Sequence, residues 1–513
     1  MLPQIPSSLS LSSLEDAKTV SRKLLLHILP SYVQTHITGT EEKPRRLHNT
    51  SALDGLRGVA ALFVFFFHIL FSYKAFVEYG YGQSEENMRF IQLPFLTLFF
   101  RGHSMVAIFF VVGGYVLSLK PLTLIHSHRH SEAHSALVSS VFRRGLRLYI
   151  PAIAITFLTM LTIWVGLWEY PRKFITDDQK FIYYADNHPN PLPTLREQFW
   201  DWVYATGSLT DVFNYYNRNG FLLPYYNAYD PHLWTVPFEY RSSLILSIAI
   251  LAFSRCKTVA RLLLVASTII FCGLWDRWEL VCFLSGSLIC DIDISLRTAN
   301  TINTDNELED LEDGEEKLPE YSELALTSPT RIYRFFSHTR RQTSHLLRSH
   351  SKASKRWIAL FTAGLYILST PNLQIEDTPG YRWLFIYLTP HTYTDKKRFL
   401  QSLGALFTTW AVANSPLLQR PFNAAFAQYL GKISYALYIV HGPLIHIVGY
   451  SVTPNVWLHV TGMGSWGYWI GLLLSSAILG VCVAVAADLF YRVVDVRSVR
   501  VARWCEEVCF VKG

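Results

Sequence analysis

The sequence is poor in charged residues. Only 17% of its 513 residues are Asp, Glu, Lys or Arg, whereas an ordinary soluble domain carries about 25%. Half of the residues are apolar. Apolar blocks of about twenty residues recur along the chain, and a helix of that length crosses a hydrocarbon core of about 30 Å. The composition argues against a soluble globular domain and predicts an all-α protein, a polytopic bundle of transmembrane helices.

The cysteines form no regular pattern. There are seven, and several lie inside apolar segments, such as Cys272, Cys282 and Cys482, which argues against a disulfide framework. The pair Cys505 and Cys509 lacks the usual spacing of a zinc site, so we expect no metal. The chain also lacks an evident cleavable signal peptide, and the first span is expected to act as the targeting signal.

The net charge of +7 does not indicate nucleic acid as a partner. The basic residues fall in short clusters between apolar segments, which is the positive-inside pattern of a protein in a lipid bilayer. With both termini in the cytosol, every cytosolic loop is basic and the opposite loops are acidic, mixed or uncharged. This agreement predicts cytosolic termini.

About ten spans are predicted, in two groups. A polar cytosolic segment, 1–50, precedes six spans of the transmembrane domain over 51–294. An acidic run and a basic Ser/His/Arg stretch over 295–356 cannot bury a core and predict a disordered cytosolic insert. Four spans over 357–491 complete the domain, and a cytosolic tail over 492–513 follows. The spans are expected near 51–73, 104–119, 148–168, 233–253, 259–275, 278–294, 357–371, 399–418, 430–450 and 466–491.

Four ionisable residues stand out inside predicted spans, where each costs several kcal/mol on insertion scales: Arg57, His68, Glu239 and His441. Arg57 and His68 are eleven residues apart, so they share one helix face and are separated by roughly 16 Å along the axis. Such a pair could line a shaft that runs into the membrane. Alternatively, Arg57 reaches the interface and His68 bonds to a neighbouring helix.

Glu239 lies roughly 10 Å down its helix from His232, at a depth compatible with His68. A buried carboxylate beside an imidazole would hold one tautomer and favour the protonated form. The alternative is a structural pair between Glu239 and Arg241 or a distant arginine. His441 is equally open to a packing role and a substrate role.

Arg144 and Arg147 lie near the cytosolic start of the third span. Residues three apart share a helix face, and two guanidiniums there suit a site for phosphate. The alternative is ordinary anchoring to lipid headgroups.

Five segments, taken in order, resemble motifs of the acyltransferase-3 family of polytopic membrane acyltransferases, typified by bacterial O-antigen acetyltransferases. They are Leu53–Ala61 with His68, Phe109–Tyr115, Arg144-x-x-Arg147 with Pro151, Leu233–Glu239, and Leu430–His441. Gly113 stands where the family usually has Ser, and only a short tail follows the last span. The chain therefore resembles a stand-alone fungal member rather than one with an added surface-glycan transfer domain.

This resemblance implies transfer of an acetyl or other short acyl group from acyl-CoA to a hydroxyl of a small metabolite, with secondary metabolism favoured, or of a glycan. It implies His68, Glu239 and Arg57 as catalytic residues and Arg144 and Arg147 as ligands of the coenzyme phosphates. His441 and Tyr115 are the residues expected to bind substrate. His68 would act as general base or carry the acyl group, and Glu239 would orient it.

Two other functions fit part of the pattern. A proton-coupled secondary transporter also uses intramembrane Arg, His and Glu, but such carriers usually show repeated halves, and none is found here. A receptor without catalysis is disfavoured by the similar depths of the ionisable residues.

The endoplasmic reticulum or another endomembrane is the expected location, and no oligomeric state is predicted. The long aromatic loop over 169–232 is a candidate to cover the acceptor site.

Overall fold

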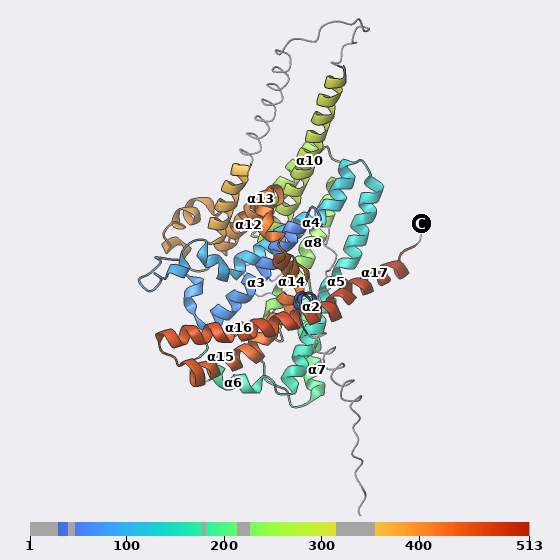
Figure 1. Cartoon of the computed structure of the whole chain (residues 1–513). Coiled ribbons are helices and arrows are strands. Elements are labelled where there is room, and N and C mark those ends of the chain that lie inside the picture. The colour runs from blue at the N-terminus through green and yellow to red at the C-terminus, as the bar shows by residue number, and fades with distance from the viewer. Residues whose placement is uncertain (1–28, 39–46, 177–180, 213–225, 314–353, 512–513) are drawn as a thin grey trace, which may run out of the picture.

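The computed structural model describes residues 29–38, 47–176, 181–212, 226–313 and 354–511 (Figure 1). All regular elements in these ranges are helical, so the predicted all-α class is confirmed. The longer helices are α3 (Ser51–Tyr73), α4 (Gly102–His126), α5 (His130–Trp164), α7 (Leu195–Thr210), α8 (Thr235–Phe253), α9 (Thr258–Leu274), α10 (Trp278–Asp313), α12 (Lys396–Asn414), α14 (Ala425–Leu444), α16 (Ser465–Phe490) and α17 (Val496–Cys509). Another helix covers 354–368. The shorter ones are α2 (Ser31–Thr38), α6 (Glu169–Thr176), α13 (Pro416–Phe422), α15 (Tyr450–Val456) and the turns η5 (Pro231–Trp234), η8 (Ile445–Gly449), η9 (Trp457–Thr461) and η10 (Tyr491–Asp495).

Six helical stretches in the described ranges are long and apolar enough to cross a membrane. They are Ser51–Tyr73, Gly102–His126, His130–Trp164, Pro231–Phe253, Ala425–Thr461 and Ser465–Cys509, and Thr258–Leu274 is a shorter apolar helix. The structure is therefore that of a multi-pass membrane protein. Helices also occupy the other segments where spans are expected. The total of about ten spans and the side of the membrane on which each terminus lies stay predictions.

Two segments differ from the sequence-based expectation. The expected basic loop before the third span is a helical hairpin, in which α4 ends at His126 and α5 begins at His130. Arg129 and Glu132 pair across its first turn, which helps the helix to start early. The expected disordered insert begins as helix, because α10 continues to Asp313. Extending a formed helix costs far less than starting one. The rest of the insert, 314–353, lies outside the described residues.

Glycines bring α3 against α14. A Cβ on Gly58 would lie 2.2 Å from the amide nitrogen of Gly431, and one on Gly431 would lie 2.5 Å from the carbonyl oxygen of Asp54. Neither position tolerates a side chain, so the two backbones are in contact. This packing sets Arg57 of α3 beside Ser434 of α14, with 3.1 Å between Nε and Oγ.

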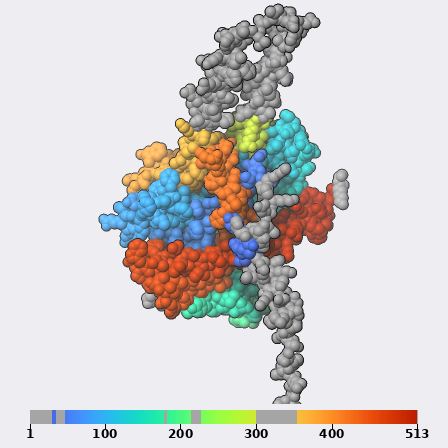
Figure 2. Space-filling view, viewed as in Figure 1, coloured from blue at the N-terminus to red at the C-terminus, as the bar shows by residue number. Residues whose placement is uncertain are grey.

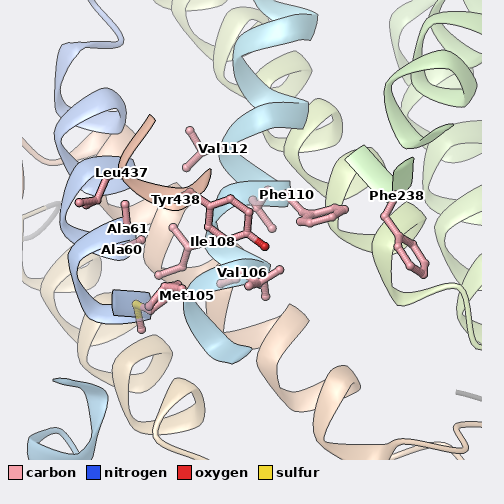
Figure 3. Packing of buried hydrophobic residues seen from close by; sticks show 14 of the residues in the cluster. Ala60, Ala61, Met105, Val106, Ile108, Phe110, Val112, Phe238, Leu437 and Tyr438 are labelled. Atoms are coloured by element: carbon pink, nitrogen blue, oxygen red, sulfur yellow. The ribbon is translucent and has the colours of Figure 1, made fainter. Parts of the chain in front are cut away.

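The same device joins α4 to α10. A Cβ on Gly114 would lie 2.0 Å from the carbonyl oxygen of Phe283, and one on Gly286 would lie 2.1 Å from that of Val111. Around this contact Phe110 meets Phe283 edge to face. Figure 3 shows the side chains of α4, α14 and α8 that pack beside it, including Val106, Phe110 and Tyr438. The core is thus a close-packed set of helices, in which charged side chains such as Arg261 and Asp291 are buried as ion pairs.

The aromatic segment after α5 folds back over one end of the bundle. It carries α6 and α7, which lie at the lower end of the view in Figure 1. The backbone amides of Tyr183 and Tyr184 donate to the carbonyl oxygen of Ser72 at the end of α3. On the visible surface, α16 (red) lies beside the light-blue segment after α3 (Figure 2), where Phe76 contacts Trp469. The loop therefore closes the bundle at the end where α3 terminates.

Candidate active site

A cavity of about 510 Å³ opens between α3, α5, α8, α14 and α17. It is lined by Leu47, His48, Ser51, Asp54, Arg57, Val106, Phe109, Phe110, Arg144, Arg147, Leu148, Thr235, Glu239, Gln428, Gly431, Lys432, Ser434, Tyr435, Tyr438, Tyr491, Asp495, Val496, Val499, Arg500 and Arg503. Six of these side chains are cationic and three are carboxylates, so the cavity carries a formal excess of positive charge. A pocket of this kind suits a phosphate-bearing ligand with an apolar portion.

Four residues expected to be functional line this cavity. Arg57, Arg144, Arg147 and Glu239 converge on it from three helices. Arg144 forms an ion pair with Glu239, with 2.5 Å between Nη2 and Oε1. The expected contact between Glu239 and His68 is therefore not present, and the pairing of Glu239 with a distant arginine is observed instead. The reason is geometric: Glu239 lies seven residues beyond His232 on the helix, and His232 takes the place beside His68.

Three histidines form a second cluster, deeper in the bundle. His68 of α3, His232 of η5 and His441 of α14 each offer a ring nitrogen, and these three atoms lie within 4.8 Å of one another. Nδ1 of His68 is 3.1 Å from Nε2 of His232. His232 and His441 are buried, whereas His68 keeps some exposed surface. His68 is therefore the accessible member of the cluster.

Two carboxylates flank His232. Asp230 accepts hydrogen bonds from the backbone amide of His232, at 3.1 Å, and from its Nδ1, at 2.9 Å. Asp186 lies on the other side, with its Oδ2 3.2 Å from Nε2 of His232. Burial alone would raise the pKa of Asp186, but the hydrogen bond and charge of His232 outweigh it and leave that pKa below its usual value. Asp186 is accordingly ionised and helps to fix the His232 ring.

Sequence reasoning missed Asp186 and Asp230 and used His232 only as a depth marker. One signal was available, because Asp230-Pro231-His232 is an Asp followed by Pro just before an apolar helix, a usual capping pattern. Such a cap fixes the direction of the next side chain, here His232. Asp186 gave no signal, because only the folding of the 181–192 segment over α3 brings it to the cluster.

A tyrosine separates the cavity from the histidine cluster. Tyr438 and Thr235 line the inner end of the cavity. Tyr438 donates from Oη to the carbonyl oxygen of His232, at 2.6 Å, and accepts from Oγ1 of Thr235, at 2.8 Å. His441 lies one turn further along α14, with its ring 5.8 Å from that of Tyr438. The shaft expected to run from Arg57 to His68 is thus interrupted here by a hydrogen-bonded barrier.

Tyr115, expected to bind substrate, lies elsewhere. Its hydroxyl donates to Oδ2 of Asp293, at 3.0 Å, and Asp293 also accepts from Trp410 and Asn414. These contacts tie α4 to α10 and α12, and Tyr115 lines neither the cavity nor the histidine cluster. The structure therefore gives Tyr115 a packing role, while His441 is brought to the cluster as a candidate acceptor contact.

The cluster also has the composition of a metal site. Three histidine nitrogens and the nearby Asp186 carboxylate would be a familiar set of ligands for zinc, and Nε2 of His441 has no hydrogen-bond partner among the described residues. However, both nitrogens of His232 already face hydrogen-bonding partners. The arrangement can thus work as a hydrogen-bonded chain from Asp230 through His232 to His68 without a metal.

These features define a class: a multi-pass membrane protein with a basic cavity that ends one helical turn from a buried histidine cluster. Residues 50–300 match the model of an acyltransferase domain, Acyl_transf_3. The chain is 30% identical over 470 residues to the O-acetyltransferase PaAT-1 of Phomopsis amygdali, a match that covers 90% of this chain and 85% of that protein. The chain belongs to the acyltransferase-3 family.

Two further fungal relatives match over most of their length. Acyltransferase clz18 of Cochliobolus lunatus is 25% identical over 87% of this chain and 93% of its own. Acyltransferase R4 of a Phoma species is 24% identical over 88% of this chain and 94% of its own. No solved structure matches this chain. The expected family is confirmed, and the protein is an acyltransferase, as these relatives are.

Proposed function

We propose that this protein transfers an acetyl or other short acyl group from acyl-CoA to a hydroxyl of a small metabolite, in an internal membrane of the cell. The observation that carries the proposal is a basic cavity whose lining residue Tyr438 hydrogen-bonds to the backbone of His232, the carboxylate-supported histidine that holds the accessible His68. The similarity to PaAT-1, an O-acetyltransferase, supports acetyl as the transferred group and an oxygen atom as its acceptor.

The coenzyme docks in the cavity with its phosphates on arginine. Arg144 is preset by its ion pair with Glu239, and Arg147 lies at i+3 on the same helix face. Arginine is suited to phosphate because its planar guanidinium donates two parallel hydrogen bonds. Arg57 lies roughly 16 Å along α3 from His68 and contacts the donor rather than the reacting carbonyl.

The thioester reaches His68 once Tyr438 moves aside. In the productive state, His232 has given up the Nε2 proton that it donates to Asp186 in the resting structure. It donates from Nδ1 to Asp230 and accepts from Nδ1 of His68, which leaves the lone pair on Nε2 of His68. That nitrogen removes the proton of the acceptor hydroxyl as its oxygen attacks the thioester carbon. The carbon–sulfur bond then breaks, and His68 returns the proton to the departing thiolate.

His232 and its two carboxylates support this cycle. Asp230 holds the His232 ring in one tautomer and orientation, as the third member of a hydrolytic triad does. Asp186 provides negative charge near the imidazolium that forms on His68. Glu239 was expected to orient His68, but it supports Arg144 instead. The chemistry proposed here uses no metal.

The acceptor approaches from the end of the bundle that the aromatic segment covers. The 181–192 segment carries Asp186 to the cluster and is fixed to α3 through Ser72. His441 contacts the acceptor beside His68, since their rings lie 5.1 Å apart.

The test is acyl transfer from radiolabelled acetyl-CoA in membranes that contain the protein, with a metabolite extract of the host as the acceptor pool. We expect an extractable labelled product with the wild type and none with His68→Ala. Elemental analysis of the purified protein should show less than stoichiometric zinc. Equal labelling by His68→Ala would overturn the mechanism. Absence of product with acetyl and longer donors, together with a proton-driven flux in vesicles free of acyl-CoA, would establish transport instead.

A further inference from the structure

Helix α17 presents one face to the basic cavity. Val496, Val499, Arg500 and Arg503 all line it. Their spacing of three, four and seven residues places them on a single side of the helix, over roughly 10 Å. The cavity wall at this point is therefore a helix face with two branched apolar side chains and two guanidiniums.

Contacts on its other sides hold α17 in this orientation. Glu506 forms an ion pair with Arg143 of α5, at 3.0 Å, and the rings of Phe510 and Phe142 lie 5.1 Å apart. Ser498 and Ala502 are buried. The helix is thus docked on α5 through residues that do not line the cavity, and its two cavity arginines are left for another partner.

The cations of the cavity fall into two groups. Arg144 is paired with Glu239, and Arg57 lies 3.7 Å from Asp54. Arg147, Lys432, Arg500 and Arg503 form no ion pair with a carboxylate of any described residue. Cations that line a cavity without a counterion suit an anionic ligand.

We propose that Arg500 and Arg503, with Lys432 of α14 in the same cavity, form a subsite for the 3′-phosphate of coenzyme A. This inference rests on the proposed function, because it takes the acyl carrier to be that coenzyme. Coenzyme A carries two separate anionic groups, a pyrophosphate bridge and a ribose 3′-phosphate. Arg144 and Arg147 hold the bridge, and α17 holds the terminal phosphate while Val496 and Val499 contact the adenosine.

A lipid headgroup offers the same phosphate chemistry. All three arginines of α17 are exposed, but only Arg500 and Arg503 share a helix face with the cavity-lining valines, and Arg497 does not line the cavity. The geometry therefore favours the soluble carrier over lipid for Arg500 and Arg503, and it makes Arg497 the matched control.

The experiment measures binding of coenzyme A and of 3′-dephospho-coenzyme A to the full chain in phosphatidylcholine nanodiscs. We expect Arg500→Gln/Arg503→Gln to weaken binding of coenzyme A about tenfold or more, as loss of a charge-assisted contact does, and to change binding of the dephospho form less than about twofold. Arg497→Gln should match the wild type for both ligands, which also reports on folding. Arg500→Lys/Arg503→Lys should keep part of the affinity.

Three results would overturn the subsite. The first is that Arg500→Gln/Arg503→Gln loses affinity equally for both ligands. The second is that this variant binds both ligands as tightly as the wild type does. In that second case coenzyme A would still be the acyl donor. The third is loss of binding to phosphatidylserine vesicles with coenzyme affinity unchanged, which would assign the arginines to lipid. A wild type that binds neither ligand would overturn the coenzyme donor itself, and the subsite with it.

Discussion

Among single residues, His232 has the densest set of polar contacts in the described part of the site. Its ring meets Asp230, Asp186 and His68 within 3.2 Å. Because hydrogen bonds inside a bundle have no water to replace them, removal of one partner leaves a buried polar group unsatisfied. A chain of this kind orients His68 more strictly than a single carboxylate could.

Replacing Asp230 tests this chain. We expect Asp230→Asn to lower kcat about 100-fold, because the amide permits the wrong tautomer of His232 and so of His68. KM for acetyl-CoA should stay within about twofold, since the cavity is unchanged. The measurement is steady-state acyl transfer with the acceptor saturating. A rise in KM with full kcat would assign Asp230 to donor binding.

Replacing Glu239 separates its two possible roles. In this structure its carboxylate holds Arg144, so Glu239→Gln should raise KM for acetyl-CoA about tenfold and leave kcat nearly unchanged. The double variant Arg144→Gln/Glu239→Gln should be no worse than Arg144→Gln alone, because both changes remove one interaction. A large fall in kcat at constant KM would restore Glu239 to the chemical step.

At the scale of helices, close packing at glycine positions the site. Gly431→Ala places a Cβ 2.5 Å from the carbonyl oxygen of Asp54, so α3 and α14 must separate. Overpacking of this kind costs about 1–3 kcal/mol, and we expect a lower thermal unfolding temperature in detergent together with lost activity. Gly480→Ala on α16 is the matched control, because the nearest atom to its Cβ would be 3.9 Å away. Equal stability of the two variants would contradict the packing argument.

The covering segment after α5 should make stability depend on pH. Burial lowers the pKa of His188 to about 4, although its hydrogen bond to the carbonyl of Trp168 opposes the shift. The unfolded chain binds this proton near pH 6.5 and the folded protein only near pH 4, so stability falls as the pH drops through that window and levels off below it.

Thermal unfolding of the wild type and of His188→Gln between pH 7 and pH 4 checks this expectation. Between pH 7 and pH 4, the thermal unfolding temperature should fall further for the wild type than for His188→Gln. Parallel curves for the two proteins would show that His188 is not the group responsible.

For the whole molecule, the predicted orientation can be tested at the C-terminus. Cys509 is exposed on α17, and cytosolic termini predict that a membrane-impermeant maleimide labels it in sealed microsomes, with the label lost in Cys509→Ser. Gly464→Cys, between α15 and α16, has open space around it and lies in a predicted opposite loop. It should react only after permeabilisation. The reverse pattern would invert the topology.

Most of the architecture could be predicted from sequence, because each span is a local property. Hydropathy located α3, α8, α9 and α16 to within a few residues. It could not locate the start of α5 or the end of α10, since those turns are polar and depend on helix propagation. The site was predictable where motifs are local, as for Arg144 with Arg147. The partner of His68 was not, because Asp186 and His232 meet it only through tertiary packing.

The barrier at Tyr438 affects how fast the acyl donor is hydrolysed when no acceptor is bound. A thioester bound as proposed in the open cavity is separated from the three clustered histidines by Tyr438 and Thr235. Water in the cavity therefore meets no activated partner there, and idle hydrolysis of acetyl-CoA should be slow in the absence of an acceptor. If Tyr438 moves aside only when the acceptor binds, the protein can keep acetyl-CoA bound without hydrolysing it.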